Sequence, residues 1–396
     1  MEVMMKELGE IITGNTPSKK TEEFWNSEDI CFVKPDIIAD NGVNEIVDSN
    51  EYISEDARKK ARVVGKNSIF VTCIGSIGKI GIASDGEYAF NQQINAIIPN
   101  DRVQPKYLAY NLLFNKPRLV AIANAPVVPI INKSQFGEFT VNIETDIDRQ
   151  CEIVDVLDKL TQIIQQRNKE ISALDDLIKA RFVEMFGSPF DTTKWTVKEL
   201  KDVSESMVDG SNVNPDYYEA KGEVLFLRIQ NVWRNEFRLD DSVYITQEIN
   251  QKYYYDTSLR TGDLLITKIG RYYTKDSSLG RVSVYRGEDD CANYSNNIMR
   301  VRLSNSMNSE FVNALLNLDD YQSFIKRTSK GGTDKRALSK SLIGSYPIII
   351  PPRALQDEFV AFVEQVDKSK LHDTKTQLYL QDYLKEMMII RHCLSH

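Results

Sequence analysis

Apolar side chains recur at helical spacing over one long stretch near the middle of the chain. Successive positions lie 4, 3, 4, 7, 3 and 4 residues apart, the spacing of a coiled-coil seam broken only at Arg167. The seam consists of Ile153, Leu157, Leu160, Ile164, Ile171, Leu174 and Ile178. Because no Pro or Gly occurs between Asp148 and Phe186, the pattern predicts a continuous helix of roughly 55 Å. Gly187 predicts its end, so we expect a central long helix over residues 148–188.

A second apolar stripe, with looser spacing, follows the last region of the chain. It predicts a C-terminal long helix over residues 353–396. Two such helices favour antiparallel pairing as a coiled coil, because each is longer than a domain of about 150 residues, whose radius of gyration is about 15 Å. The alternative is that each helix packs only on the domain that precedes it.

A region of different pattern precedes each long helix, over residues 1–147 and 189–352. The apolar runs of these regions are short, as in mixed α/β domains. Apolar runs such as residues 68–72 and 95–98 predict short strands, which alternate with turns rich in glycine. The pattern therefore predicts an α+β fold in which two globular domains are each followed by a long helix.

The two halves of the chain also repeat each other in sequence. Residues 131–139 are similar to residues 338–346, about half the chain away, and residues 72–82 are similar to residues 267–284. A solenoid is excluded because its repeats run about 20–50 residues. We therefore expect a duplicated domain, and with it a pseudo-twofold internal repeat.

Composition limits the class of protein. The chain has 396 residues, of which 42% are hydrophobic and 27% charged, as expected for two or three globular domains. No apolar run approaches the roughly 18 residues that cross a membrane. The five cysteines form no CxxC pair, which favours a reducing, cytoplasmic setting and argues against a metal site. The net charge of −8 is unusual for a nucleic-acid reader, but residues 260–340 are rich in Lys and Arg.

Motifs of common enzymes are incomplete or lacking. The run Asn214-Pro215-Asp216-Tyr217 differs at its third position from the loop of amino methyltransferases, and no glycine-rich cofactor loop accompanies it. Asp216, Glu219 and Lys221 spell a nuclease pattern, but they stand too close together for that metal site. No phosphate-binding loop occurs, and the three histidines all lie in the last 25 residues. We therefore expect a protein without catalytic or metal-binding residues.

Polar, glycine-rich loops are the remaining candidates for function. Their glycines let backbone N–H groups approach phosphates, while Lys, Arg, Ser and Asn side chains reach phosphate oxygens or base edges. A solvated surface loop is the alternative for each. The candidate DNA-binding residues are Asn15, Thr16, Ser18, Lys19, Lys20, Ser76, Lys79, Lys133, Lys268, Arg271, Tyr272, Lys330, Gly331, Gly332, Thr333 and Lys335.

In their order along the whole chain, these features resemble the specificity subunit of type I restriction-modification systems (the HsdS family). The second copy departs from the first, since Ser295-Asn296-Asn297 replaces Asn91-Gln92-Gln93 and no Thr-Pro pair follows Gly210. The segments that carry the resemblance are residues 14–19 with Trp25, 72–81, 90–93 and 131–133, the start of the first long helix at 150–152, and then the second cycle.

The resemblance implies a non-catalytic, sequence-specific reader of double-stranded DNA. Each globular domain would be a target recognition domain for one half of a bipartite, asymmetric site. The coiled coil would set the spacer and dock methylation (M) subunits, which restriction (R) subunits later join. S-adenosylmethionine and ATP with Mg would be cofactors of those partners, and this chain would hold none. The alternatives are a coiled-coil adaptor that does not bind DNA, and a fused DNA methyltransferase or nuclease.

Overall fold

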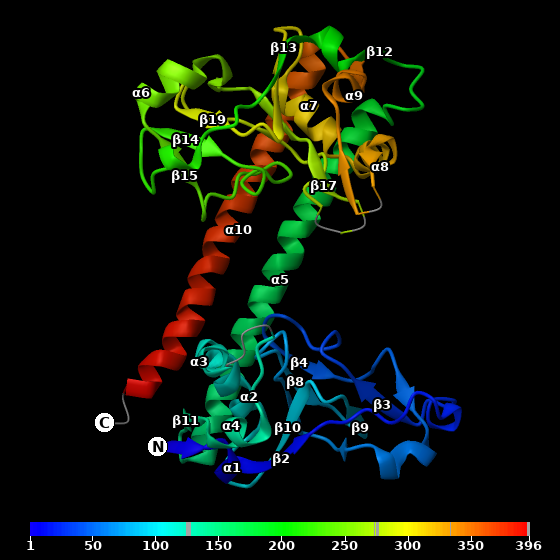
Figure 1. Ribbon diagram of the computed structural model, residues 1–396, viewed down its shortest axis with the longest axis vertical. Coiled ribbons are helices and arrows are strands. Elements are labelled where there is room, and N and C mark those ends of the chain that lie inside the picture. The colour runs from blue at the N-terminus through cyan, green and yellow to red at the C-terminus, as the bar shows by residue number, and fades with distance from the viewer. Residues whose placement is uncertain (124–127, 273, 275–276, 333, 394–396) are drawn as a thin grey trace. The chain divides into compact units, whose positions relative to one another are not determined.

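The chain folds into two compact units, which we call unit 1 and unit 2 (Figure 1). The computed structural model describes residues 1–123, 128–272, 274, 277–332 and 334–393. Unit 1 comprises Met1–Lys169 with Asp373–His396, and unit 2 comprises Glu170–His372. The two long helices, α5 (Ile147–Phe186) and α10 (Arg353–Cys393), therefore each contribute to both units. The expected domain limits at 147/148, 188/189 and 352/353 lie beside the ends of these helices.

Unit 1 is built on two mixed sheets and a two-stranded pair. The sheets have the strand orders β2-β10-β7-β8-β4 and β5-β3-β9-β6, and β1 pairs with β11. Every residue of β7, β8 and β9 is buried, which is why these strands read as continuous apolar runs. The strands are β1 (Glu2–Met4), β2 (Gly9–Thr13), β3 (Ile30–Val33), β4 (Val43–Ile46), β5 (Tyr52–Ile53), β6 (Val63–Val64), β7 (Ile69–Thr72), β8 (Ile80–Ala83), β9 (Tyr88–Phe90), β10 (Ile94–Pro99) and β11 (Thr140–Asn142).

Short helices complete unit 1, and two of them have clear N-terminal caps. Helix α2 begins with Pro105 at its first turn, and the Gln104 side chain accepts a hydrogen bond from the Tyr107 N–H. Helix α4 begins with a capping box between Asn132 and Gln135, whose two bonds measure 2.9 and 3.0 Å. The helices are α1 (Met5–Leu8), η1 (Glu22–Phe24), η2 (Glu55–Lys60), α2 (Pro105–Phe114), α3 (Lys116–Ile122) and α4 (Lys133–Glu138).

Unit 2 repeats this plan. Its sheets have the orders β13-β20-β16-β18 and β15-β14-β19, and β12 pairs with β23. The strands are β12 (Thr196–Glu199), β13 (Ser204–Asp209), β14 (Val224–Leu227), β15 (Val243–Ile245), β16 (Leu264–Thr267), β18 (Val282–Val284), β19 (Ala292–Tyr294), β20 (Ile298–Leu303) and β23 (Pro347–Ile350). The helices are η3 (Leu200–Val203), η4 (Pro215–Tyr217), α6 (Gln247–Ile249), η5 (Asn250–Tyr254), η6 (Tyr255–Thr257), α7 (Ser309–Leu316), α8 (Asp319–Thr328) and α9 (Lys340–Gly344).

The predicted duplication is confirmed by matching strand order and matching hydrogen bonds. Strands β2, β10, β7 and β8 have the same neighbours as β13, β20, β16 and β18, and β3 and β9 are parallel, as β14 and β19 are. The Thr72 hydroxyl accepts from the Lys79 N–H at 2.9 Å, and the Thr267 hydroxyl accepts from the Arg281 N–H at 2.9 Å. The likeness in sequence therefore reflects one scaffold built twice.

Unit 2 also contains a small three-stranded sheet. Strands β17 (Ile269–Arg271), β22 (Lys335–Ala337) and β21 (Lys330–Gly331) form an antiparallel sheet in that order. In the described residues of unit 1, the single bridge between Ile74 and Ile130 occupies the equivalent place. Among the residues that the structure describes, the two copies therefore differ at this place.

The predicted seam of the central helix contributes to both units. Ile153 and Leu157 are buried in the core of unit 1, and Ile178 packs against the core of unit 2. Between them, Leu160, Ile164, Ile171 and Leu174 are half-buried. The helix ends at Gly187, which has a φ of 73°. The seam therefore serves partly to attach the helix to the two domains.

Within unit 2, the end of α5 packs against the first half of α10. Asp175 accepts a hydrogen bond from Lys370 at 2.6 Å, and the Phe182 and Phe359 rings lie 5.2 Å apart. Since the higher number on one helix pairs with the lower number on the other, the two segments run antiparallel. No helix among the described residues is long and apolar enough to span a membrane.

Candidate nucleic-acid interface

The structure brings most of the predicted residues of unit 2 together on the β17–β22–β21 sheet. Arg271 lies opposite Lys335, while Gly270 and Gly331 lie on either side of Arg336. Segments more than 60 residues apart in sequence thus meet in one small sheet. Gly332 follows β21 and is exposed, and Thr333 lies outside the described residues.

Three cations share one face of this sheet. Residues that lie opposite one another, or two apart along a strand, have side chains on the same face. By this rule Arg271, Lys335 and Lys330 share a face, because Lys330 lies opposite Ala337 and Ala337 is two residues from Lys335. All three cations are exposed. Such a face can neutralise phosphates without burying charge.

The other face carries an aromatic ring and a fourth cation. Tyr272 follows β17, and its N–H donates to the Asp334 carbonyl at 2.9 Å, which extends the ladder by one residue. The Arg336 guanidinium lies 3.7 Å from the centroid of the Tyr272 ring. Arg336 is absent from the residues predicted from sequence. In the sequence, only its position next to the predicted Lys335 pointed to Arg336. The contact of its guanidinium with the Tyr272 ring depends on the register between β17 and β22, which the sequence does not reveal.

Lys268 has a different environment from the sheet cations. Its ammonium group lies 2.7 Å from the Asp209 carboxylate, and its side chain is only 17% exposed. The charge of Lys268 is therefore already balanced inside the unit. Its contact with DNA stays a prediction from sequence.

In unit 1, the predicted loop over residues 15–20 packs beside strand β9 and helix η2. The Asn15 amide donates to the Lys60 carbonyl at 2.6 Å, and the Thr16 hydroxyl donates to Gln92 at 2.9 Å. Ser18 and Lys20 are exposed. Lys19 is exposed too, and its ammonium lies 3.1 Å from Glu51 and 4.8 Å from the centre of the Trp25 ring. The loop is thus held by its first two residues and presents the rest to solvent.

The other predicted residues of unit 1 differ in exposure. Ser76 lies exposed in the turn between β7 and β8, and Lys133 is exposed at the first position of α4. Lys79 is half-buried, donates to the Pro35 carbonyl at 3.2 Å and pairs with Asp40 at 2.8 Å. Its hydrogen bond lowers the pKa of the Asp40 carboxyl group.

The unit 2 equivalent of Lys79 also has a structural environment. Arg281 is buried, donates to the Ser277 carbonyl at 3.0 Å and lies 3.7 Å over the Trp233 ring. Both copies therefore use this cation inside the fold, and a DNA contact of Lys79 stays a prediction from sequence.

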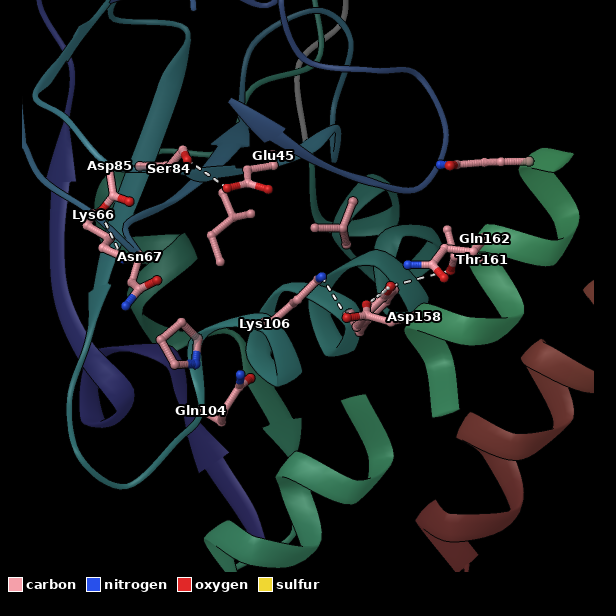
Figure 2. Close-up of a pocket in the computed structure, with 16 residues that line it drawn as sticks. Glu45, Lys66, Asn67, Ser84, Asp85, Gln104, Lys106, Asp158, Thr161 and Gln162 are labelled. Carbon is pink, nitrogen blue, oxygen red and sulfur yellow. Dashed lines mark hydrogen bonds and ion pairs between the residues drawn. The ribbon is translucent and has the colours of Figure 1, made fainter. Parts of the chain in front are cut away.

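A polar pocket of about 400 Å³ in unit 1 lies between α2, α5 and the strands β4 and β8 (Figure 2). Asp158 of α5 accepts hydrogen bonds from Lys106 and from the Tyr110 hydroxyl, both at 2.7 Å. Burial raises the pKa of Tyr110, which keeps this hydroxyl protonated as a donor. Across the pocket, Glu45 accepts from Ser84 at 2.6 Å. The bonds of Asp158 to Lys106 and Tyr110 attach α5 to α2 of the domain.

The Asn214-Pro215-Asp216-Tyr217 run has a structural role. The Asn214 side chain accepts from the Asp216 N–H at 3.2 Å and so caps the short helix η4. Among the described residues, no group of three or more His, Cys, Asp or Glu side chains is placed to hold a metal ion.

Comparison with known proteins identifies a shared domain. The family model described as the type I restriction modification DNA specificity domain matches residues 1–173 and 192–379. The MjaIX specificity subunit of a type I restriction enzyme from Methanocaldococcus jannaschii is 24% identical over 406 residues, which cover 95% of this chain and 89% of that protein. The HindI specificity subunit from Haemophilus influenzae is 26% identical over 194 residues, but the match spans only 40% of its length.

Solved structures share the fold at low sequence identity. The S subunit of a type I restriction-modification system from M. genitalium has a TM-score of 0.53 and 14% identity, with 98% of this chain and 94% of that chain covered. A chain from a structure on complex assembly and conformational transition of the type I R-M system has a TM-score of 0.54 and 15% identity, with 98% and 96% covered. At these identities the likeness concerns the fold alone.

Proposed function

Because the chain belongs to the type I restriction modification DNA specificity family, we propose that it is the non-catalytic subunit that selects the DNA sequence in such a complex. Each unit reads one half of a bipartite, asymmetric site in double-stranded DNA. One observation carries this proposal: one scaffold is built twice, with the same strand order in both copies, and the copies differ in their polar loops. Two different readers on one chain suit a split, asymmetric target.

The exposed cations supply the chemistry for binding DNA. Arg271, Lys330 and Lys335 in unit 2, like Lys20 and Lys133 in unit 1, are exposed cations. Contacts of Lys and Arg with phosphates release counterions and give most of the affinity, while polar side chains that reach base edges give specificity. A chain with a net charge of −8 can bind DNA in this way because its cations are concentrated on particular faces.

The long helices act as the ruler and as the docking element. Antiparallel contacts between the end of α5 and the start of α10 within unit 2 support pairing along their whole length. Readers of two half-sites on one side of B-DNA lie about one helical turn, roughly 34 Å, apart. A rigid helix pair can hold such a spacing, and its outer surface can bind methylation subunits.

The chemistry of the complex belongs to the partners. Methylation subunits transfer the methyl group from S-adenosylmethionine, and restriction subunits that join them use ATP with Mg. This chain holds no cofactor in the proposed scheme and contributes only binding energy and position.

The test is to co-express the chain with a methylation subunit encoded beside it and to select ligands from a random-sequence DNA pool. We expect one enriched motif with two short defined halves and an undefined spacer. A complex that assembles but enriches no motif would support the coiled-coil adaptor and contradict our proposal. Methylation or cleavage of DNA by this chain alone would support the fused enzyme instead.

A further inference from the structure

The Arg336 side chain lies over an aromatic ring and leaves its hydrogen-bond donors unused. Its guanidinium lies 3.7 Å from the Tyr272 ring centroid, a stacked geometry that limits rotamer freedom. The Arg336 Nε is buried and has no hydrogen-bond partner. Across the described residues, neither terminal nitrogen of Arg336 donates a hydrogen bond or forms an ion pair. The end of the guanidinium that carries the two terminal nitrogens is therefore the edge available to a ligand.

The neighbours of Arg336 keep that edge accessible. Both residues opposite it in the sheet are glycines, Gly270 and Gly331. At Gly331, which has a φ of 140°, a Cβ would lie 2.7 Å from the Lys335 carbonyl oxygen, so a side chain there is excluded. Gly331 is also exposed and lies in the edge strand β21. A ligand can thus approach Arg336 over the edge of the sheet.

The arrangement separates two kinds of DNA contact. Arg271, Lys330 and Lys335 share the opposite face, where exposed charges suit phosphates. Arg336 lies on β22, the central strand of the small sheet, and an arginine that donates through two nitrogens to guanine O6 and N7 is the commonest specific contact in the major groove. The β17–β22–β21 sheet therefore carries the candidate base contact on one face and the candidate phosphate contacts on the other.

We propose that Arg336 reads a guanine in the half-site bound by unit 2, and that Tyr272 is its positioning residue. This inference rests on the proposed function and specifies one base within it. Arg336 determines sequence preference at one position, while the three cations of the other face set affinity for any sequence.

The test uses the complex with methylation subunits and starts from the half-sites that the wild-type complex selects. Arg336→Ala is expected to lose the preference for one guanine and to bind the wild-type site about 10–100-fold more weakly. Arg336→Lys keeps the charge but not the planar fork, so it should lose the same preference. Tyr272→Ala should weaken the preference in part, whereas Tyr272→Phe keeps the ring and should retain it.

Lys330→Ala is the matched control on the opposite face. It should weaken binding to all sequences alike and lower the slope of log affinity against log salt by about 1. Arg336→Ala should leave that slope unchanged, and the half-site read by unit 1 should not alter in any variant. The thermal unfolding midpoint of each variant is measured as well, and a midpoint equal to that of the wild type shows that the variant is folded.

Three results would overturn the inference. The first is an Arg336→Ala complex that keeps every base preference. The second is one that behaves like Lys330→Ala, which would make Arg336 a phosphate contact. The third is a wild-type half-site without a guanine in either strand. A wild-type complex that selects no bipartite motif at all contradicts the proposed function itself, and that outcome is seen before any variant is made.

Discussion

Two threonines illustrate how single side chains maintain each copy of the domain. Thr72 and Thr267 are fully buried at the ends of equivalent strands. Each hydroxyl accepts from a backbone N–H at 2.9 Å and donates to a carbonyl, that of Ser76 in one copy and Ser278 in the other. These bonds close the turn that follows each strand.

Replacing either threonine by valine should therefore destabilise its own unit by about 1–3 kcal/mol, because a backbone N–H and a backbone carbonyl lose their partner in the hydroxyl while the volume is kept. Urea unfolding of Thr72→Val and Thr267→Val checks this. Thr196→Val, at an exposed position of strand β12, is the control and should change stability by less than about 0.5 kcal/mol. Equal losses of unfolding free energy in the buried and the exposed variants would contradict the structural role of the two threonine hydroxyls.

The cysteines give a second residue-scale prediction. Burial raises the pKa of the Cys73 thiol to about 12, whereas Cys151 and Cys291 are exposed. Only the thiolate is nucleophilic, so iodoacetamide at pH 8 should label Cys151 and Cys291 in the folded protein and leave Cys73 unmodified. Peptide mass spectrometry measures the labelling, and unfolding in urea should make Cys73 reactive. Rapid labelling of Cys73 without denaturant would contradict its burial.

At the scale of elements, a buried glutamine joins each long helix to its domain. Gln150 of α5 accepts from the Gln104 N–H and donates to the Glu144 carbonyl, both at 2.7 Å. Gln356 of α10 accepts from the Asn308 N–H and donates to the Pro351 carbonyl, both at 2.9 Å. Both glutamines are fully buried, so the helices start from equivalent anchor points.

Gln150→Leu and Gln356→Leu should each destabilise the protein by about 1–3 kcal/mol for every backbone group left without a partner. Gln162→Leu, on the exposed side of α5, is the matched control and should be near neutral. Thermal unfolding compares the three variants. A control as unstable as Gln150→Leu would show that the loss comes from the helix surface and not from the anchor.

For the whole molecule, the duplication predicts modular specificity. Replacing residues 1–147 by the equivalent segment of another family member should change one half of the selected DNA motif and preserve the other, because unit 2 keeps its own sheets and loops. Selection from a random DNA pool with the exchanged complex measures both halves. A change in both halves would refute independent reading by the two units.

The helices give a second prediction at this scale. Deleting one heptad from α5 and the matching heptad from α10 shortens each helix by about 10 Å, or roughly 3 base pairs of B-DNA, while the phase of the seam is kept. We expect the undefined spacer to shorten by about that number, with both halves unchanged. A spacer of unaltered length would show that the helices are not the ruler.

The sequence by itself determined the duplicated α+β fold, the two long helices and the class of protein. Those features rest on local periods and on likeness between segments, as for the seam from Ile153 to Ile178. Only the tertiary structure decided which polar residues are available to a ligand. Asp209 and Asp40 pair with Lys268 and Lys79, although nothing local to either lysine indicates this. Arg336 reaches Tyr272 because strand register joins segments more than 60 residues apart, and pairing at that distance is set by the packing of the whole sheet.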